Sequence, residues 1–297
     1  KALKLFFQLS YIPSPYSIYH NVFKLKKENY LIYDTKDNSI KYQKILKDKI
    51  IDSKLNLDNN KKFEQFDSLF SGVIEDHLIS DVKNGTLLSG GIDSTIVTYY
   101  SNLVSNKKID SFCVKSNDKN YDESHFAENV AKKIGTNHHT LEFSQSDLFD
   151  SITNIHKVYD EPFGDSSQIP TYLLFKSIKN NIKVALSGDG GDEVFYGYNR
   201  YIFLNQYYKY LKRINPNFRK LLSKSLRLIS EKGYDKINSL FNLHQINFGN
   251  KIYKISQSLN FENIEDFYFQ IIRQDYGFEN IIKLDQDSNL SFLEKIN

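Results

Sequence analysis

The middle of this 297-residue chain alternates between strand and helix patterns, which predicts an α/β fold with a parallel sheet flanked by helices. Short apolar runs typical of buried strands recur at 86–88, 109–114, 138–143 and 184–186. Helical patterns separate them, as expected where crossovers join parallel strands. The residues after 195 are rich in Tyr and Phe and are predicted to form a mostly helical C-terminal part.

Before the first strand, we expect an extended segment, a linker and a helix. Residues 1–45 are predicted to be extended and turn-rich, because Pro13 and Pro15 disfavour helical backbone in the residues before them. Residues 46–62 are predicted to be a linker that ends in a polar run. A helix is expected from about 63 to 79, with five apolar residues on one face: Phe66, Leu69, Phe70, Val73 and Ile74.

The later helices follow from apolar periodicity and from the turn residues between the strands. We expect them at 92–103, 122–134, 147–159 and 168–179. Gly135 is expected to end the second of these, because glycine accepts the left-handed backbone of a helix C-cap. The first and last strands each run into a Ser-Gly turn, which sets them apart from the other two.

Composition excludes several classes of protein. The chain is 40% hydrophobic and 25% charged with a net charge of +3, which gives no reason to expect a nucleic-acid partner. There is no apolar run of about 18 residues and no recognisable signal peptide, so we expect a cytoplasmic protein without a membrane partner. Cys113 is the single cysteine, cannot form an internal disulfide, and is expected to be buried in a strand.

Two sequence features could suggest a binding site, but a purely structural role explains each of them better. His138 and His139 begin a strand without Cys or acidic residues at ligand spacing, so a structural role is expected. The stretch 209–227 holds seven Lys or Arg residues and no acid. Apolar residues there fall on one helical stripe, which predicts a solvated basic face over a packed apolar one: Phe218, Leu221, Leu222 and Ile229.

The first glycine loop, 89–94, has the sequence Ser-Gly-Gly-Ile-Asp-Ser and joins a strand to a helix. Ligands bind at such positions in α/β sheets, where backbone N–H groups and the positive end of the helix attract anions. Asp93 can hold a Mg²⁺ that bridges phosphates. No lysine occupies the position that a Walker-type phosphate loop requires.

The second glycine loop, 187–193, has the sequence Ser-Gly-Asp-Gly-Gly-Asp-Glu and again follows a strand. Asp189 would share a helical face with Asp192 and Glu193 if the helix began early. Crowded carboxylates repel one another, so a nearby cation is expected. A third segment, 159–170, also concentrates acids between Pro and Gly residues, and alone it is interpreted as a solvated loop.

Together these segments resemble the synthetase half of the glutamine-hydrolysing asparagine synthetases, within the ATP-pyrophosphatase superfamily. The first loop is typical of the whole superfamily, whereas three other motifs are more specific to this family. They are Ile79-Ser80-Asp81-Val82, Asp160-Glu161-Pro162-Phe163 with Asp165-Ser166-Ser167, and the second loop continuing to Gly197-Tyr198. The resemblance implies a Rossmann-like adenine-nucleotide α-hydrolase fold. It also implies three parts: 1–45 as the tail of a glutaminase-like domain, 46–62 as a linker, and 63–297 as a C-terminally incomplete synthetase domain.

The resemblance implies that ATP and Mg²⁺ bind at these loops. Ser89, Gly90, Gly91 and Ser94 would cradle the pyrophosphate part of ATP, with Asp93 beside them. The rest of the nucleotide would contact Leu87, Val114, Ser187 and Gly188. The implied Mg²⁺ ligands are Asp93, Asp160 and Asp192, and the implied catalytic residues are Asp189 and Asp192.

The implied reaction is attack of the aspartate side-chain carboxylate on the α-phosphate, with ammonia then displacing AMP to give asparagine. The implied partners are small molecules, with ammonia derived from glutamine, and a homodimer stays open. The family's N-terminal Cys nucleophile and its Val-Lys-Val-Asp-Arg segment are both absent, so we expect a fragment of a longer enzyme.

Three other functions stay open at this point. The carboxylate could be another acid, such as a sugar acid of surface-polysaccharide synthesis. A tRNA-modifying ATP-pyrophosphatase shares the first loop, but the acid-rich second loop and residues 11–33 count against it. A non-catalytic scaffold would have no use for clustered carboxylates.

Overall fold

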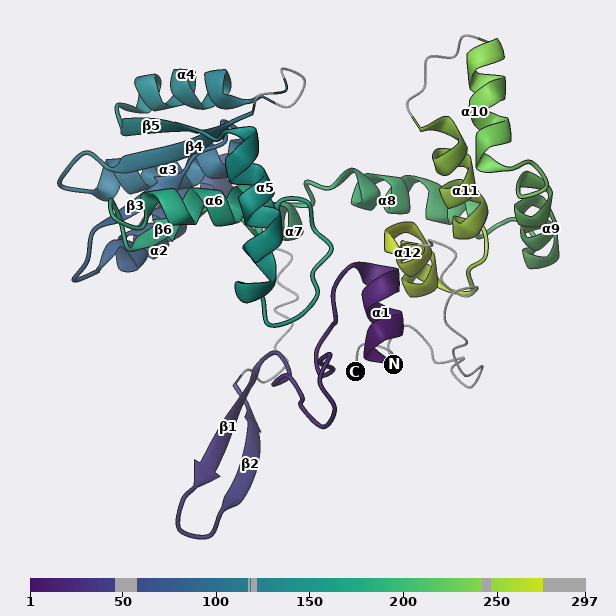
Figure 1. The fold of residues 1–297 in the computed structure, drawn as a ribbon, viewed down its shortest axis with the longest axis horizontal. Coiled ribbons are helices and arrows are strands. Elements are labelled where there is room, and N and C mark those ends of the chain that lie inside the picture. Colours follow the sequence, from purple (N-terminus) through teal and green to yellow (C-terminus); the bar gives the residue numbers. More distant parts are fainter. Residues whose placement is uncertain (46–57, 117, 119–121, 242–246, 275–297) are drawn as a thin grey trace. The chain divides into compact units, whose positions relative to one another are not determined.

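The computed structural model describes residues 1–45, 58–116, 118, 122–241 and 247–274 (Figure 1). Its contacts divide the chain into two compact units. The sheet unit comprises Asp48–Asp160 and Asp165–Gly197. The helical unit comprises Lys1–Lys47, Glu161–Gly164 and Tyr198–Asn297.

The sheet unit is built on four parallel strands in the order β5-β4-β3-β6. In chain order the strands are β3 (Asn84–Leu87), β4 (Asp110–Lys115), β5 (Asn137–Glu142) and β6 (Val184–Leu186). The central strand β3 pairs with both β4 and β6, so the two strands that precede the glycine loops are neighbours. The predicted parallel α/β fold is confirmed.

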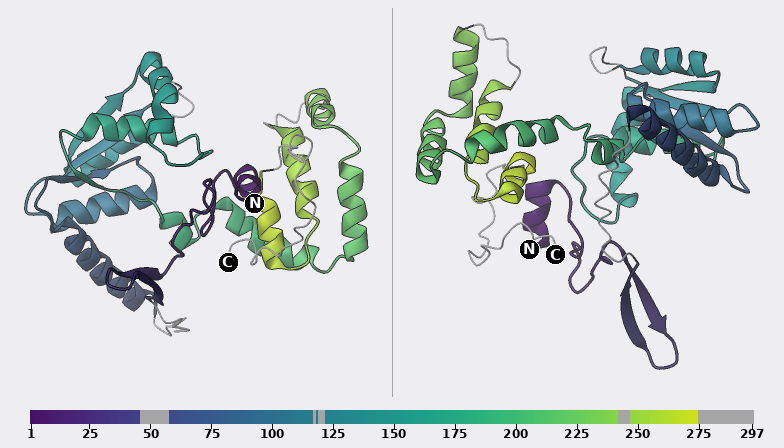
Figure 2. Two further views of the ribbon diagram at one scale, coloured as in Figure 1. Left: turned by 60° about the horizontal axis from the view of Figure 1, so that its bottom comes forward. Right: turned by 180° about the vertical axis from the view of Figure 1, so that it is seen from behind.

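Helices lie on both faces of this sheet (Figures 1 and 2). They are α2 (Asn59–Leu78), α3 (Ile92–Val104), α4 (Ser124–Ile134), α5 (Gln145–Asn154), the 3-10 turn η1 (Ile155–Lys157), α6 (Gln168–Ile178) and the short α7 (Gly191–Phe195). Successive strand side chains alternate between the faces. Cys113 packs with Ala127 of α4, whereas its neighbour Phe112 packs with Ile178 of α6.

Local capping explains where these helices begin and end. The Asp58 carboxylate accepts a hydrogen bond from the Lys61 N–H at 2.9 Å, so α2 begins at Asn59, earlier than predicted. Ser144 forms a capping box with Asp147 at the start of α5. Gly135 has a φ of 87° and ends α4, as predicted.

Within the described ranges, the helical unit contains α1 (Ala2–Leu9), the antiparallel hairpin of β1 (Asn29–Asp34) and β2 (Ser39–Lys44), and five later helices. The later helices are α8 (Asn199–Leu211), α9 (Pro216–Leu226), α10 (Glu231–Leu240), α11 (Phe248–Ser258) and α12 (Ile264–Ile272). Phe267 is fully buried among the rings of Phe203, Tyr208 and Phe261. The predicted mostly helical C-terminal part is confirmed, and its Tyr and Phe residues supply part of its core.

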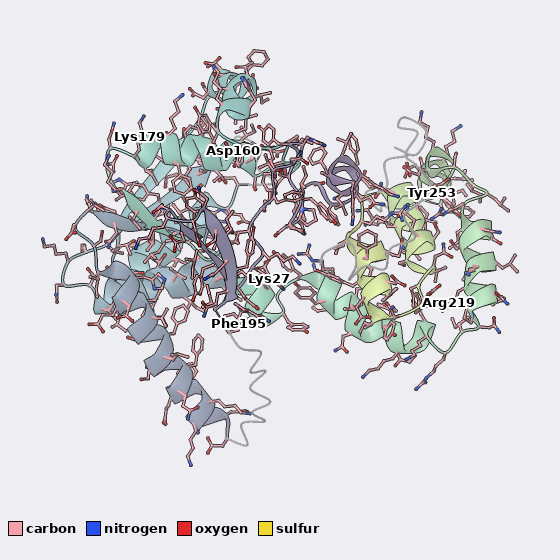
Figure 3. All side chains as sticks on the ribbon, turned by 90° about the horizontal axis from the view of Figure 1, so that it is seen from below. Lys27, Asp160, Lys179, Phe195, Arg219 and Tyr253 are labelled. Atoms are coloured by element: carbon pink, nitrogen blue, oxygen red, sulfur yellow. The ribbon has the colours of Figure 1, made fainter. Side chains whose placement is uncertain are left out.

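Two expectations about local structure were wrong. Residues 2–9 form a helix rather than an extended segment, because their apolar residues recur at helical spacing and bury Leu5. Residues 39–44, by contrast, form a strand within the segment that was expected to be extended. In α9 the predicted packed stripe faces outward, with Phe218 57% exposed. The inner position is taken by Arg219, labelled in Figure 3, which stacks on Phe261 and is only 4% exposed.

The predicted three-part organisation stays a prediction. Residues 46–57 of the expected linker lie outside the described residues, and residues 59–62 belong to α2. Among the helices of the described ranges, none combines the length and the apolar character that crossing a membrane requires.

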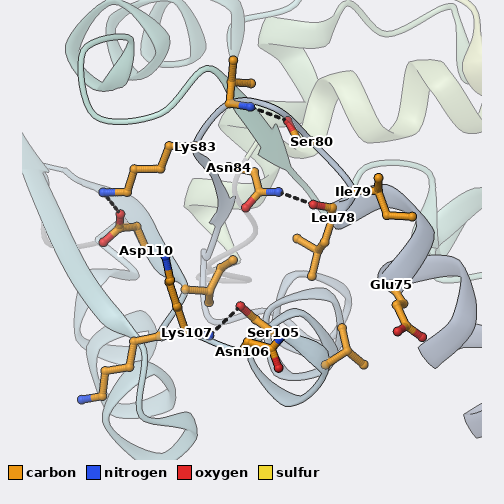
Figure 4. A pocket seen from close by; sticks show the side chains of 14 residues that line it. Glu75, Leu78, Ile79, Ser80, Lys83, Asn84, Ser105, Asn106, Lys107 and Asp110 are labelled. Carbon is orange, nitrogen blue, oxygen red and sulfur yellow. Dashed lines mark hydrogen bonds and ion pairs between the residues drawn. The ribbon is translucent and has the colours of Figure 1, made fainter.

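A buried carboxylate stabilises the amino end of the sheet. Asp110, only 5% exposed, receives hydrogen bonds from Asn137 and from His139 at 3.3 Å, and it pairs with the Lys83 ammonium at 2.5 Å (Figure 4). Burial alone would raise the pKa of Asp110, but the bonds from Lys83, Asn137 and His139 outweigh burial and hold the pKa below its ordinary value. Folding therefore favours the ionised form.

We expect Asp110→Asn to lower the free energy of unfolding at pH 7 by about 1–3 kcal/mol, because the ion pair with Lys83 is lost. The folded pKa lies below the unfolded value of about 4, so the stabilisation is present above pH 4 and disappears as the pH falls through the folded pKa. Urea unfolding at pH 7 and at pH 3 measures it. The exposed Asp76→Asn on α2 is the control; equal acid sensitivity of parent and Asp110→Asn would contradict the prediction.

Candidate functional site

The first glycine loop is a tight turn that only glycine fits at Gly90. It joins the carboxyl end of β3 to the start of α3. Gly90 has a φ of 88°, and a Cβ there would lie 2.8 Å from the backbone nitrogen of Ala127. Both the backbone angle and the close approach of α4 therefore exclude a side chain at this position.

Two serine hydroxyls close this loop from inside. The Ser89 N–H donates to the Ser94 Oγ at 3.2 Å, and the two Oγ atoms lie 3.0 Å apart. Ser94 also donates to the Gly91 carbonyl at 3.2 Å. Gly91 is the N-cap of α3 and offers no side-chain acceptor, so the first-turn N–H groups of that helix are left for another acceptor. An anion is the partner that such a helix end favours.

The second glycine loop packs directly against the first. A Cβ on Gly188 would lie 2.6 Å from the Ser94 nitrogen, and a Cβ on Gly191 would lie 2.5 Å from the Asp93 Cγ. These distances are shorter than any contact between real side-chain carbons, so the absence of side chains lets the loops touch. The structure thus brings the first loop's Asp93 and Ser94 to the second loop's Gly188.

Asp189 and Asp192, two acids of the second loop, have different surroundings. Asp189 accepts a hydrogen bond from the Ser187 hydroxyl at 3.0 Å. The helix α7 begins only at Gly191, so Asp189 lies outside it and does not share a helical face with Asp192. The Asp192 carboxylate lies against Gly197, where a Cβ would approach its Oδ1 to 1.9 Å. Asp189, and not Asp192, is the acid that accompanies Asp93.

A cavity of about 430 Å³ opens beside both loops. Its polar wall includes Asp93, Ser187 and Asp189. Its apolar wall is formed by residues of α2, α3, β6 and α7: Phe66, Phe70, Val73, Ile74, Ile96, Val97, Leu186, Val194 and Phe195. Four of the five predicted apolar residues of α2 line it, whereas Leu69 is 69% exposed.

Sequence analysis missed Phe195 as part of this wall. Its ring lies 5.9 Å from that of Phe66 in an edge-on arrangement, and Phe66 stacks on Phe70 at 5.2 Å. The available signal was an aromatic residue directly after the second acid loop. An apolar wall of this kind would exclude water once a ligand covers it, which would strengthen electrostatic interactions at the loops.

The residues predicted to contact adenosine are partly buried on the α6 side of the sheet. Leu87 and Val114 pack against the cluster of Phe112, Leu174 and Ile178. They lie near the carboxyl ends of the neighbouring strands β3 and β4, at the same edge as both glycine loops. Their contact with a nucleotide stays a prediction.

The three predicted metal ligands are not gathered into one cluster. Asp160, labelled in Figure 3, lies in the connection between η1 and α6, and it does not line the cavity that Asp93 lines. Among the residues that the structure describes, no three His, Cys, Asp or Glu side chains lie close enough to hold a metal ion. A Mg²⁺ here would depend on substrate phosphates for part of its coordination, which is usual for this ion.

Cys113 and the two histidines have structural surroundings, as predicted. Burial raises the pKa of the Cys113 thiol and disfavours the nucleophilic thiolate. His138 lies 2.8 Å from the Ser111 hydroxyl, and His139 stacks on Phe112. A larger cavity, about 650 Å³, lies at the amino ends of β3 and β4, at the opposite edge from the glycine loops (Figure 4).

Comparison with known proteins gives one consistent result. A family model described as asparagine synthase matches residues 65–269. A putative glutamine-hydrolysing asparagine synthetase 2 of Methanocaldococcus jannaschii is 34% identical over 275 residues, which cover 92% of this chain and 50% of that protein. Asparagine synthetase B of Escherichia coli is 33% identical over 143 residues, 42% of this chain and 25% of that protein.

The chain spans half or less of the length of these relatives. Among solved structures, an NH3-dependent NAD synthetase from Campylobacter jejuni, in complex with the nitrate ion, matches 68% of this chain and 97% of that chain. Its TM-score is 0.35 and its identity 12%, a likeness too weak to bear on function.

We expect Gly188→Ala to separate the two loops, because its methyl group would collide with the Ser94 backbone nitrogen. The variant should lose about 1–3 kcal/mol of stability, and any thermal stabilisation that MgATP gives the parent should largely disappear. Melting curves with and without MgATP measure both effects.

Gly72→Ala is the matched control, since a Cβ at Gly72 of α2 meets nothing within 4 Å. This change should stabilise the helix by about 0.5–1 kcal/mol and leave the MgATP response unchanged. A Gly188→Ala protein that responds to MgATP like the parent would show that the loop contact is not needed.

Proposed function

Because this chain belongs to the asparagine synthase family, we propose that it carries the ATP-dependent half of an amide-forming ligase. A substrate carboxylate attacks the α-phosphorus of ATP, and pyrophosphate leaves. Ammonia then attacks the carbonyl carbon of the acyl-adenylate, and AMP leaves as the amide forms. Aspartate is the proposed carboxylate and asparagine the proposed product. The observation that carries the proposal is the contact of the two glycine loops around Asp93.

The first loop supports pyrophosphate as the leaving group. The open amides of α3 face the place where an anion would sit, and the Ser89 and Ser94 hydroxyls line the same turn. No lysine of the γ-phosphate transfer type is present in this loop. Fixed amide and hydroxyl donors can stabilise the charge that develops on the departing pyrophosphate.

Mg²⁺ is proposed as the metal, with Asp93, Asp160 and Asp192 as its candidate ligands. Asp93 fits this role, since carboxylate oxygens are the protein ligands that Mg²⁺ prefers and Asp93 stands where the two loops meet, whereas Asp160 and Asp192 do not line the same cavity. When bound, the ion supplies charge neutralisation for the phosphates. Asp93 is the strongest candidate because Gly188 and Gly191 hold it in place from the second loop.

The second loop is proposed to act on the carboxylate side of the reaction. Asp189 lines the cavity next to Asp93 and is held by the Ser187 hydroxyl, so it can orient the incoming amine. Asp192 is proposed as a second catalytic carboxylate. The apolar wall around Phe66 and Phe195 supports exclusion of water, which would otherwise hydrolyse the acyl-adenylate. Most of the acceleration then comes from positioning and charge neutralisation.

Glutamine is the proposed source of the ammonia, delivered by a glutaminase activity of the longer enzyme. The supporting observation is the 34% identity, over 92% of this chain, with a relative whose name specifies glutamine hydrolysis. A homodimer is part of the same proposal.

The first prediction concerns the bond that breaks. The longer enzyme that we propose this chain belongs to, incubated with ATP, Mg²⁺, aspartate and ammonium, should form AMP, pyrophosphate and asparagine in equal amounts, because attack is at the α-phosphorus. Separation of the nucleotide products and amino-acid analysis measure this. AMP formed only with another acid, or only with tRNA, would change the substrate; ADP and orthophosphate as the main products would exclude the proposed reaction.

The second prediction concerns Asp93. Asp93→Asn keeps the size of the side chain but removes its charge, so the Mg²⁺ concentration for half-maximal ATP binding should rise about 10- to 100-fold. Asparagine is tolerated in the first turn, so the melting temperature without ligand should change little. Titration calorimetry over a Mg²⁺ series measures the shift, with Asp76→Asn as control. An unchanged Mg²⁺ dependence would show that Asp93 is not a ligand.

A further inference from the structure

The helix α9 buries polar side chains and exposes apolar ones, which is the reverse of an ordinary surface helix. Arg219 and Ser223 are 4% and 2% exposed, whereas Phe218 and Leu221 are 57% and 60% exposed. These four residues lie within two turns of one helix. Apolar side chains gathered on an exposed face mark a surface that binds something, so this face of α9 needs an explanation.

The spacing of the residues divides α9 into three stripes, because residues three and four positions apart share a helix face. Arg219 and Ser223 form the inward stripe. Lys220 and Lys224, both exposed, form a basic stripe one position further along. The outward stripe comprises the large apolar residues of the exposed face and of the turn after the helix: Phe218, Leu221, Leu222, Leu228 and Ile229.

Contacts with the residues after α11 hold the inward stripe in place. The Arg219 guanidinium lies 3.7 Å from the centroid of the Phe261 ring (Figure 3). The Asn260 side-chain amide donates to the Ser223 hydroxyl at 3.0 Å. Both partners belong to the helical unit, as α9 does. These contacts fix the rotation of α9 about its axis, so the outward stripe cannot turn inward unless they break.

Positive charge accompanies the outward stripe. No Asp or Glu occurs between Glu193 and Glu231, whereas the same interval holds eight Lys and Arg residues. Lysine stems can lie along an apolar surface while the ammonium groups reach toward a polar layer. Lys220 and Lys224 therefore suit a partner that is apolar where it meets the outward stripe and anionic beside it.

An anionic lipid surface matches this face better than a folded protein does. The 11 residues of α9 give a face about 16 Å long and about 10 Å wide, at the edge of the helical unit (Figures 1 and 2). This is far smaller than the about 800 Å² per partner of a stable protein interface. A lipid surface needs no complementary shape. Helices with Phe and Leu on one side and lysines on another lie in the headgroup layer and favour anionic lipids.

We infer that α9 is a membrane-surface helix, whose outward stripe inserts at the boundary between headgroups and acyl chains while Lys220 and Lys224 contact lipid phosphates. The expectation of no membrane partner rested on the lack of a spanning segment and of a signal peptide, and a helix that lies on the surface requires neither. The inference is independent of the proposed ligase reaction, because it uses no residue of the glycine loops and its test needs no ATP.

Tryptophan fluorescence tests the inference, because the chain contains no tryptophan. In Phe218→Trp, vesicles of phosphatidylcholine mixed with phosphatidylglycerol should shift the emission to shorter wavelength, and vesicles of phosphatidylcholine alone should not. Adding Lys220→Gln and Lys224→Gln should weaken vesicle binding about 10- to 30-fold. In about 1 M salt, where the screening length is about 3 Å, binding should also weaken. Leu221→Trp provides a second reporter on the same stripe.

Phe149→Trp on α5 is the matched control. Phe149 and Ile152 are both exposed and three residues apart, as in the outward stripe, but the acids Asp147 and Asp150 accompany them in the helix. The emission of this variant should not change with either kind of vesicle. Equal shifts in the α5 and α9 reporters would overturn the inference, since apolar exposure without basic residues would then be sufficient.

Three further results would also overturn the inference. The first is unshifted emission in both α9 reporters when their circular dichroism matches that of the parent. The second is a shift that depends on protein concentration without vesicles, which would assign the stripe to a second copy of the chain. The third is a shift with polyglutamate but not with vesicles, which would assign the stripe to an acidic protein.

The longer enzyme should sediment with the mixed vesicles and remain in solution with phosphatidylcholine vesicles alone. Failure to sediment would show that the rest of that enzyme covers the outward stripe, and would overturn the inference. Sedimentation of an enzyme that forms no AMP would contradict the proposed reaction and leave the membrane contact supported.

Discussion

The close packing of two glycine loops around one aspartate is the constraint on which the site depends. Gly188 and Gly191 have no side chains, and this lets the second loop reach the first turn of α3 and the Asp93 carboxylate. The contact requires β6 to lie beside β3, because only neighbouring strands bring their carboxyl ends this close. Contact between the two loops therefore requires both the strand order of the sheet and the glycines of the second loop.

The packing of the two loops also brings charged groups together at one cavity. Asp93 and Asp189 line one cavity and have the uncapped amides of α3 nearby. The carboxylates are stabilised by a cation, and the open N–H groups are stabilised by an anion. A metal–phosphate ligand supplies both, whereas a simple anion or a lone metal ion supplies one. The arrangement therefore agrees with the proposal that a nucleotide binds here together with its metal.

Much of the sheet unit could be predicted because its signals are local. The 184–186 strand, the start of α3 at Ile92 and the end of α4 at Gly135 follow from apolar runs and glycine positions within a few residues. The glycine loops were recognised for the same reason, and the structure brings them together. The N-terminal helix α1 was missed, because two prolines beyond its end dominated the interpretation of the whole segment.

What could not be predicted depends on partners distant in the sequence. Periodicity placed Phe218 on a packed stripe of α9, but it cannot reveal that Phe261 offers Arg219 a ring to stack on. In the same way, Asp160-Glu161-Pro162 indicates an acidic loop without indicating that Ile18 and Lys24 receive the second of its acids. A charged residue is assigned to solvent by default, and only a tertiary partner overrides that assignment. The sequence alone does not distinguish Glu161, which Ile18 and Lys24 contact, from its neighbour Asp160.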